Sequence, residues 1–216
     1  MNFRFTIGKK IGLGFGVIIV LVIISFLLTN VTLNDSRKKT DQVTEIFNPS
    51  VATLKELDNL LNRSKLLITK WYYVTTGNDA VDKKALRKLL KDEYPLLKKK
   101  IHQYSVTWNQ AEQESVEAIL ALVDQMFLSY QEDIMAKLNS FDSYNDSNIK
   151  FEALLPFEDL DTKFNIISEN LIALIDKQNS NALSNSDDML SSFSFLQKIV
   201  IWLGIILSIG GIVIAV

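Results

Sequence analysis

The side chains best suited to chemistry in this sequence are a short aromatic run and three basic residues on other segments. The run Lys70 to Tyr73 reads Lys-Trp-Tyr-Tyr, and Arg87, Lys137 and Lys163 follow later in the chain. Aromatic faces and basic groups together can hold a small anion by stacking and charge-assisted hydrogen bonds. The candidate ligand-binding residues are therefore Trp71, Tyr72, Tyr73, Arg87, Lys137 and Lys163. The alternative, more common for aromatic residues at helical spacing, is that Trp71 is a core residue and the bases form a solvated rim.

The sequence offers little for catalysis or metal binding. It contains no cysteine, and its only histidine, His102, is expected to be an ordinary surface or boundary residue of a helix. So few nitrogen and sulfur ligands do not predict a transition-metal site. The acidic pairs Glu112–Glu114 and Asp187–Asp188 lie in polar segments and are expected to be solvated, and calcium needs a tighter cluster of oxygens. We therefore expect no enzyme activity, no cofactor and no metal.

The stretch Ile7 to Leu28 carries three alternating glycines followed by an apolar run. A dinucleotide-binding loop needs the spacing G-x-G-x-x-G, and a P-loop needs a lysine after its glycines; neither is present. Residues 11–29 carry no charge, and about 20 apolar residues span the ~30 Å hydrocarbon core of a bilayer. A signal peptide has a shorter apolar core and a small-residue cleavage site. The sequence therefore predicts an uncleaved transmembrane helix at 11–29, preceded by a cytoplasmic segment at 1–10.

A second apolar segment, residues 199–216, ends the sequence and carries no ionisable side chain. It predicts a second transmembrane helix, and we expect the natural chain to continue into cytoplasmic domains. Small residues four apart allow membrane helices to approach closely. Gly12 with Gly16, and Gly204 with Ser208, have this spacing and are the candidate packing residues of the two spans.

Charge limits the function of the segment between the spans. Residues 30–198 hold 20 basic and 25 acidic side chains, and this mildly acidic balance speaks against nucleic-acid binding. The basic residues flanking the first span are nearly equal in number on its two sides, three at 4–10 and three at 37–39, so the positive-inside rule does not decide the orientation. We expect the N-terminus inside and residues 30–198 outside the cytoplasm.

Within residues 30–198 the apolar residues recur at spacings of three and four, which is typical of amphipathic helices. The predicted helices are 30–76, 81–107, a third from Asn109 to about 141, and a fourth from near Pro156 into the second span; Pro49 and Pro95 are expected kinks. Representative core positions are Leu54, Leu57, Ile68, Trp71, Leu86, Ile101, Ile119, Phe127, Leu160 and Leu171. No strand pattern appears. The expected fold is all-α, an antiparallel up-down four-helix bundle whose first and last helices continue into the spans.

The middle two predicted helices are shorter than the outer two and should stop before the bilayer. Beyond them the stripe of the fourth helix meets polar residues, Gln178, Asn181, Asn185 and Asp188. Few apolar contacts make a segment easy to displace. We therefore expect the outer helices to continue as a mobile stalk.

Two stretches resemble methyl-accepting chemotaxis proteins with a four-helix-bundle sensor domain. TIGKKIGLGFGVIIVLVII, residues 6–24, is similar to the N-terminus of that family, and ENLIALIDKQNSNA, residues 169–182, to its last sensor helix. The resemblance implies a homodimeric receptor of the bacterial inner membrane that senses a small molecule or a periplasmic protein. It also implies a cytoplasmic relay and kinase-coupling region, which this sequence lacks.

The expected function is therefore transmembrane signal transduction, as the input half of a chemotaxis receptor. Related sensor halves occur on histidine kinases and diguanylate cyclases. A membrane-anchored helical adaptor without signalling is the alternative from another class. The expected partners are a second copy of the chain and the lipid bilayer, with no nucleic acid.

Overall fold

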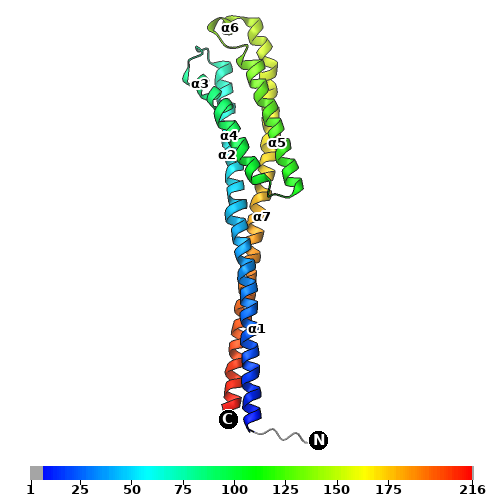
Figure 1. Cartoon of the computed structure of the whole chain (residues 1–216). Coiled ribbons are helices and arrows are strands. Elements are labelled where there is room, and N and C mark those ends of the chain that lie inside the picture. Colours follow the sequence, from blue (N-terminus) through cyan, green and yellow to red (C-terminus); the bar gives the residue numbers. More distant parts are fainter. Residues whose placement is uncertain (1–6, 216) are drawn as a thin grey trace. The chain divides into compact units, whose positions relative to one another are not determined.

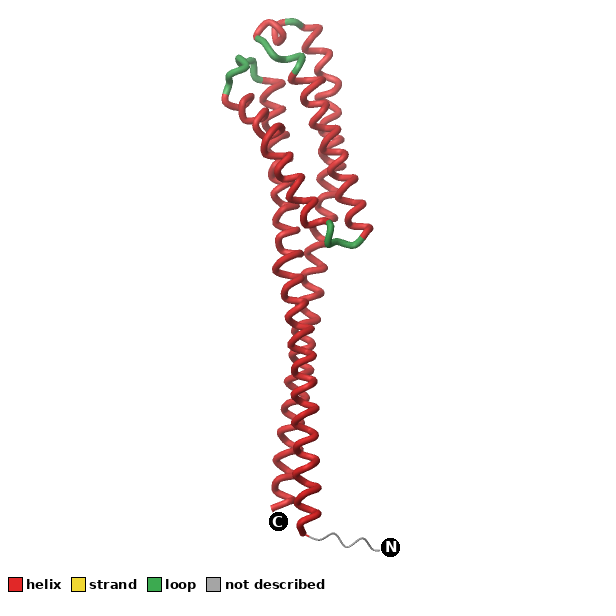
Figure 2. Tube along the Cα trace, viewed as in Figure 1, coloured by secondary structure: helices red, strands yellow, loops and turns green. Residues whose placement is uncertain are grey.

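The structure is a computed structural model that describes residues 7–215, with side chains described for residues 8, 12 and 14–210. Across that range the chain is all-α, with no strand (Figures 1 and 2). Residues 1–6 of the predicted cytoplasmic segment, and residue 216 of the second predicted span, lie outside the described range.

The first long helical stretch has a π-helical segment directly before the helical turn that contains Pro49. α1 covers Ile7–Asp41, the π segment η1 covers Gln42–Phe47, and α2 covers Asn48–Tyr73. Proline lacks the N–H for an i→i−4 bond and clashes with the preceding turn, so a widened turn before it is a physical solution. The predicted disturbance at Pro49 is thus confirmed, as a π segment within continuous helix.

The second and third stretches follow the predicted pattern. α3 covers Val81–Lys88, η2 Leu89–Glu93 and α4 Tyr94–Ser105, so a π segment again precedes a proline, Pro95. α5 covers Gln110–Ser129 and η3 Tyr130–Met135. Asn109, where the third helix was expected to begin, is the N-cap of α5, because its side chain accepts a hydrogen bond from the Glu112 backbone N–H at 3.0 Å.

The start of the last helix differs from the prediction. The expected loop contains a short helix, α6, at Phe141–Asn145, and α7 runs from Ser147 to Ala215. Pro156, expected near the helix start, lies inside α7. Its missing N–H leaves the Glu152 carbonyl without its usual partner, and Lys137 Nζ approaches that oxygen at 3.5 Å. A tertiary contact thus helps to accommodate the proline.

The chain divides into two compact units. The core unit is Glu45–Asn181, and the terminal unit consists of Met1–Thr44 with Ala182–Val216. The second and third helical stretches lie wholly in the core unit, whereas α7 belongs to both.

The core unit buries residues from all four long stretches in one hydrophobic cluster. The ten representative core positions are buried, with exposed fractions from 0% to 5%. Phe141, the expected last residue of the third helical stripe, is 57% exposed, because the chain leaves that helix earlier and Phe141 begins α6. Trp108, which follows α4, donates from Nε1 to Ser50 Oγ near the start of α2 at 2.9 Å, so the first two stretches run antiparallel. Gln178 of α7 donates from Nε2 to Glu112 near the start of α5 at 2.9 Å, so the last two also run antiparallel.

The terminal unit pairs α1 with the C-terminal part of α7 through smaller residues. Thr40 Oγ1 lies 3.0 Å from Met189 Sδ, and Lys39 Nζ lies 3.7 Å from Asp188. Only Ser36 and Leu196 are buried among its described side chains. The less exposed positions of α1 recur at three and four residues, at Gly14, Ile18, Leu21, Ser25, Thr29, Thr32, Ser36 and Lys39.

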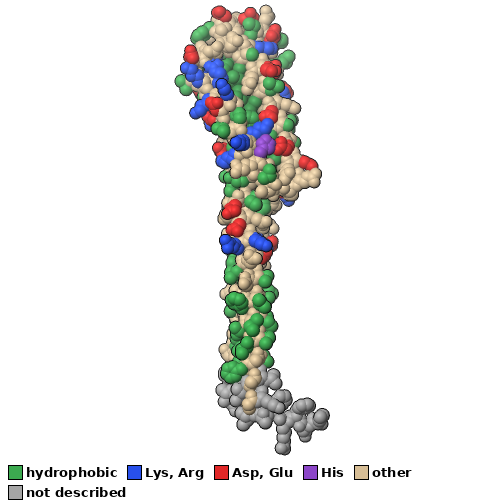
Figure 3. Space-filling view, viewed as in Figure 1, with side chains coloured by type: hydrophobic (Ala, Val, Ile, Leu, Met, Phe, Trp, Pro, Cys, Tyr) green, Lys and Arg blue, Asp and Glu red, His purple; other side chains and the backbone are tan. Residues whose placement is uncertain are grey.

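Among the described residues, two helices are long and apolar enough to cross a membrane, by length and composition. They contain residues 14–29 and 199–210 of the predicted spans, and their most apolar windows are 0% and 6% buried within the chain. In Figure 3, apolar side chains cover much of the stem directly above the grey residues, and a band of charged side chains follows above them. A helix that is apolar all round and unburied needs an apolar environment outside the chain.

Candidate functional site

Trp71 forms one wall of the candidate ligand site and is itself a core residue. Its side chain is 2% exposed, and its Nε1 donates to the Leu138 carbonyl at 2.9 Å. Tyr144 of α6 donates its hydroxyl to the Trp71 carbonyl. The polar atoms of both aromatic residues are therefore engaged in structure, and burial raises the pKa of Tyr144 to about 12. What they offer to other groups is their ring faces.

Lys83 occupies the space between these rings. It is 1% exposed, and its Nζ lies 4.9 Å from the Trp71 ring centroid and 4.7 Å from that of Tyr144. The ammonium donates to the Thr76 carbonyl at 2.8 Å. Among the described residues, no carboxylate lies within ion-pair distance of Lys83. Burial, and then repulsion from Arg87, lower the pKa of this amine.

Arg87 stands one turn after Lys83 on the same helical stretch and faces the same indole. Its guanidinium carbon is 5.3 Å from the Trp71 ring centroid, and an Nη donates to the Asn78 carbonyl. Two cations thus converge on the loop 74–80 and hold it by backbone carbonyls alone. An ammonium buried this fully without an acidic partner is rare in folded proteins.

Tyr72 and Tyr73 belong to a neighbouring aromatic cluster. Tyr72 stacks on Phe157 with ring centroids 4.3 Å apart, and Tyr73 meets the same ring edge-on at 5.4 Å. Tyr72 is buried, and burial is the main cause of its raised pKa. Tyr73 is 63% exposed and is the only exposed member of the three candidate aromatic residues.

The other two candidate bases are paired with acids of α7. Lys137 lies 3.4 Å from a Glu152 carboxylate oxygen, and Lys163 lies 2.9 Å from Asp159, one turn before it. Trp71 and Arg87 are thus brought together, whereas Lys137 and Lys163 each have a different partner. The sequence prediction missed Lys83, because a lysine between Asp82 and Lys84 reads as a surface residue. The available signal was its place three residues before Leu86 on the apolar stripe.

The glycines predicted to pack in the spans have open space beside them. Apart from the backbone of its own helix, a methyl group built on Gly12, Gly16 or Gly204 would meet no described atom within 4 Å. Ser208 donates to the Gly204 carbonyl at 2.8 Å within its own helix. Close packing at these positions remains a prediction.

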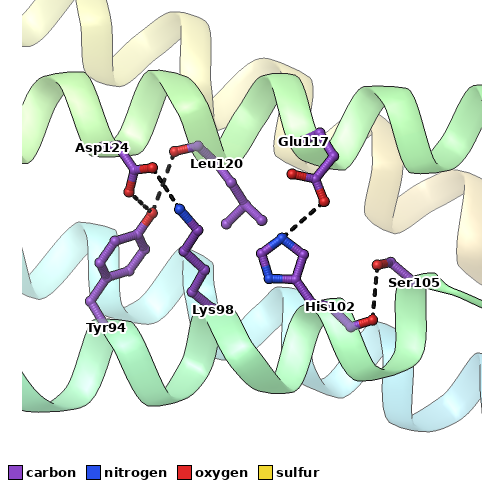
Figure 4. Close-up of polar contacts among 7 residues, drawn as sticks. All are labelled: Tyr94, Lys98, His102, Ser105, Glu117, Leu120 and Asp124. Atoms are coloured by element: carbon purple, nitrogen blue, oxygen red, sulfur yellow. Dashed lines mark hydrogen bonds and ion pairs between the residues drawn. The ribbon is translucent and has the colours of Figure 1, made fainter.

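Polar pairs also link α4 to α5. Tyr94 donates to Asp124 at 2.7 Å, Lys98 lies 2.6 Å from the other oxygen of that carboxylate, and His102 Nε2 lies 2.9 Å from Glu117 (Figure 4). His102 is thus a partly exposed residue in a helix–helix ion pair, in agreement with the boundary position expected from sequence.

One acidic residue is buried without a cation. Glu112 is 5% exposed, and its two oxygens accept hydrogen bonds from Gln178 and Asn181 of α7, each at 2.9 Å. Its place in the first turn of α5 puts the carboxylate near the positive end of the helix dipole. The expectation that Glu112 is solvated does not hold, because α7 covers it.

No protein-family model, no curated protein and no solved structure matches this chain. Among the described residues, no group of three or more His, Asp or Glu side chains is placed to hold a metal ion.

Proposed function

We propose that this chain is the input half of a transmembrane receptor of the chemotaxis type, with the core unit as its sensor domain. The observation that carries the proposal is the continuity of α7. This helix begins within the core unit at Ser147 and continues without interruption into the second apolar segment. A rigid helix that joins a folded domain to a membrane segment transmits a displacement of one to the other.

The core unit has the features expected of a four-helix-bundle sensor. Four helical stretches share one hydrophobic cluster, and the end contacts Trp108–Ser50 and Gln178–Glu112 support an up-down order. In this proposal, residues 30–198 lie outside the cytoplasm of a bacterium, the spans cross the inner membrane, and the receptor is a homodimer. Gly12, Gly16, Gly204 and Ser208 are then available for contacts between copies.

The terminal unit is suited to relay because its helices contact each other through few large side chains. A shift of about 1–2 Å is enough when the downstream element has two discrete states. We favour the signalling region of a chemotaxis receptor as the downstream output domain. A histidine kinase or a diguanylate cyclase could be joined to the same input half.

A disulfide lock in the terminal unit tests the relay. Residues 1–216 are joined to the relay and signalling regions of a chemotaxis receptor, and Thr40→Cys and Met189→Cys are introduced together, because these side chains touch at 3.0 Å. We expect oxidation to change kinase activity and reduction to restore it. The single-cysteine variants are the controls.

The same hybrid distinguishes a receptor from an adaptor. Cysteines at positions 34 and 188 report the helix proximity in each signalling state. Kinase activity that is identical in the oxidised and reduced forms, with an unchanged crosslinking pattern, would exclude the transducer and favour a membrane-anchored adaptor.

A further inference from the structure

The strongest unexplained feature of the core unit is the pair of cations beside Trp71. Lys83 and Arg87 lie one helical turn apart and face the same indole ring, at 4.9 Å and 5.3 Å from its centroid. Like charges this close and partly desolvated repel each other. The cost is offset only by ring faces and by two loop carbonyls, which carry partial rather than full negative charge.

The nearby acids do not compensate these cations. Asp82 lies 3.2 Å from Lys70, and Asp79 lies 3.2 Å from Lys84. Both of these pairs are largely exposed to solvent. Among the described residues, Lys83 and Arg87 thus face the same indole ring with no carboxylate within ion-pair distance of either.

The charge around this point has the same sign. Residues 81–105 hold eight lysines and arginines against three acidic residues, in a domain that is otherwise acidic. Figure 3 shows Lys and Arg side chains gathered on the flank formed by α3. A local positive potential of this kind raises the concentration of small anions near the surface and speeds their association.

The loop 74–80, whose carbonyl oxygens accept hydrogen bonds from Lys83 and Arg87, is held by few other contacts. Its backbone makes hydrogen bonds from Val74 to Lys70 at 2.9 Å, from Ala80 to Gly77 at 3.1 Å and from Lys84 to Ala80 at 3.0 Å, and its largely exposed Asp79 pairs with Lys84. Gly77 lies close to the exposed ring of Phe141, and a Cβ atom added to Gly77 would lie 3.5 Å from that ring. A segment with so few buried contacts opens at low free-energy cost.

We propose that Lys83 and Arg87 form the binding site for a small oxyanion, a carboxylate or a phosphate, which replaces the carbonyl oxygens of Thr76 and Asn78. The rings of Trp71 and Tyr144 form rigid walls, since their polar atoms are already bonded. Binding moves the loop 74–80 away from α3 and neutralises the repulsion between the two cations. This inference rests on the proposed sensor function and names the ligand class of the sensor domain.

Anion binding to the full chain in lipid nanodiscs tests the site. Sodium acetate and sodium phosphate are titrated at constant ionic strength, with sodium chloride as the reference, and thermal unfolding and calorimetry report binding. We expect one of the two oxyanions to raise the unfolding temperature in a saturable way. The anion that does so decides between a carboxylate and a phosphate ligand.

Two variants and one matched control locate the effect. Charge-assisted hydrogen bonds are worth about 1.5–3 kcal/mol, so Lys83→Met and Arg87→Gln should each weaken binding about tenfold or more. Lys84→Met removes an exposed neighbouring charge and should change affinity less than about threefold. Arg87→Gln carries the test if Lys83→Met does not fold, because Arg87 is only partly buried.

The proposal is wrong if neither oxyanion shifts unfolding beyond chloride, or if Lys84→Met weakens binding as much as Arg87→Gln. Failure of the receptor proposal is a separate outcome. An oxyanion that binds through Lys83 and Arg87, but leaves the crosslinking of the cysteines at 34 and 188 unchanged, would retain the site and exclude the relay.

Discussion

The core unit and the terminal unit differ in how much apolar surface they bury. In the core unit, leucine, isoleucine and aromatic residues form one buried cluster. In the terminal unit only Ser36 and Leu196 are buried among the described side chains, whereas Phe15, Ile19 and other large apolar residues of α1 are exposed. This exposed apolar surface is what the proposed membrane location would cover.

This difference has an energetic consequence. Burial of apolar area drives association only where water is the alternative. The core unit therefore gains its stability from its own interior, whereas the two helices of the terminal unit gain little from contact with each other. Local stability should be high in the first unit and low in the second, as a relay requires.

The largest expected difference in stability between the two units comes from substituting two leucines of α7. Leu171 is 0% exposed in the core unit, and Leu190 is 61% exposed in the terminal unit. Leu171→Ala should cost about 2–5 kcal/mol through lost burial and a residual cavity. Leu190→Ala should change stability by less than about 0.5 kcal/mol. Chemical denaturation of the full chain in nanodiscs measures both, and equal effects would remove the contrast.

Alkaline pH should weaken the core unit selectively, because its buried tyrosines resist ionisation. The pKa of Tyr130 and of Tyr144 is raised by burial to about 12, from 10.0. Between these values the unfolded chain loses protons that the folded chain retains, so stability present below pH 10 is lost as pH rises toward 12. The loss is about 2–3 kcal/mol per tyrosine at most.

Lys83 affects the pH dependence of folding stability in the direction opposite to that of the buried tyrosines. Its pKa is lowered in the folded chain, so its contribution to stability rises with pH up to the ordinary value of 10.5. Thermal melts from pH 8 to 11 should show a steeper decline in Lys83→Met than in the wild type and a shallower decline in Tyr130→Phe. If Tyr130→Phe leaves the dependence of melting temperature on pH unchanged, buried Tyr130 does not cause the alkaline loss of stability.

Glu112 tests a polar contact inside the core unit. Glu112→Gln replaces one acceptor oxygen by an NH₂ group that faces another amide donor, so a buried hydrogen bond is lost. We expect a loss of about 1–3 kcal/mol. Glu114→Gln is the control, because Glu114 is exposed and accepts only from Gln110 at 2.9 Å. Equal melting temperatures for both variants would mean that the layer at Gln178 and Asn181 does not hold α7.

Sequence reasoning succeeded where local pattern decides the outcome. The apolar stripes placed Leu57, Ile119 and Leu171 in the core, and the N-cap at Asn109 follows from side-chain chemistry. Both depend on residues within a few positions of each other. The same reasoning predicted disturbances at Pro49 and Pro95, because a missing N–H is a local fact.

It failed where distant residues decide. The start of α7 at Ser147 depends on contacts that tolerate Pro156, including Lys137 from the turn that follows η3. The burial of Lys83 depends on Trp71 and Tyr144, which are 12 positions before it and 61 after it. Glu112 was expected to be solvated because its partners lie on another helix. Charged groups are the residues whose environment a single sequence predicts least well.

The smallest expected effect is also the most direct comparison, because one substitution is made in both units. Ser50 Oγ accepts from Trp108 Nε1 at 2.9 Å, so Ser50→Ala leaves a buried indole N–H unpaired and should cost about 1–2 kcal/mol. Ser36 is 3% exposed, and its Oγ has no hydrogen-bond partner among the described residues. Ser36→Ala removes an unsatisfied buried hydroxyl and should be neutral or stabilising, by up to about 1 kcal/mol. Parallel denaturation of the two variants measures the difference in sign. If Ser36→Ala is destabilising by as much as Ser50→Ala, the hydroxyls of the α1 inner face contribute cohesion, and the terminal unit is held together more tightly than its small side chains imply.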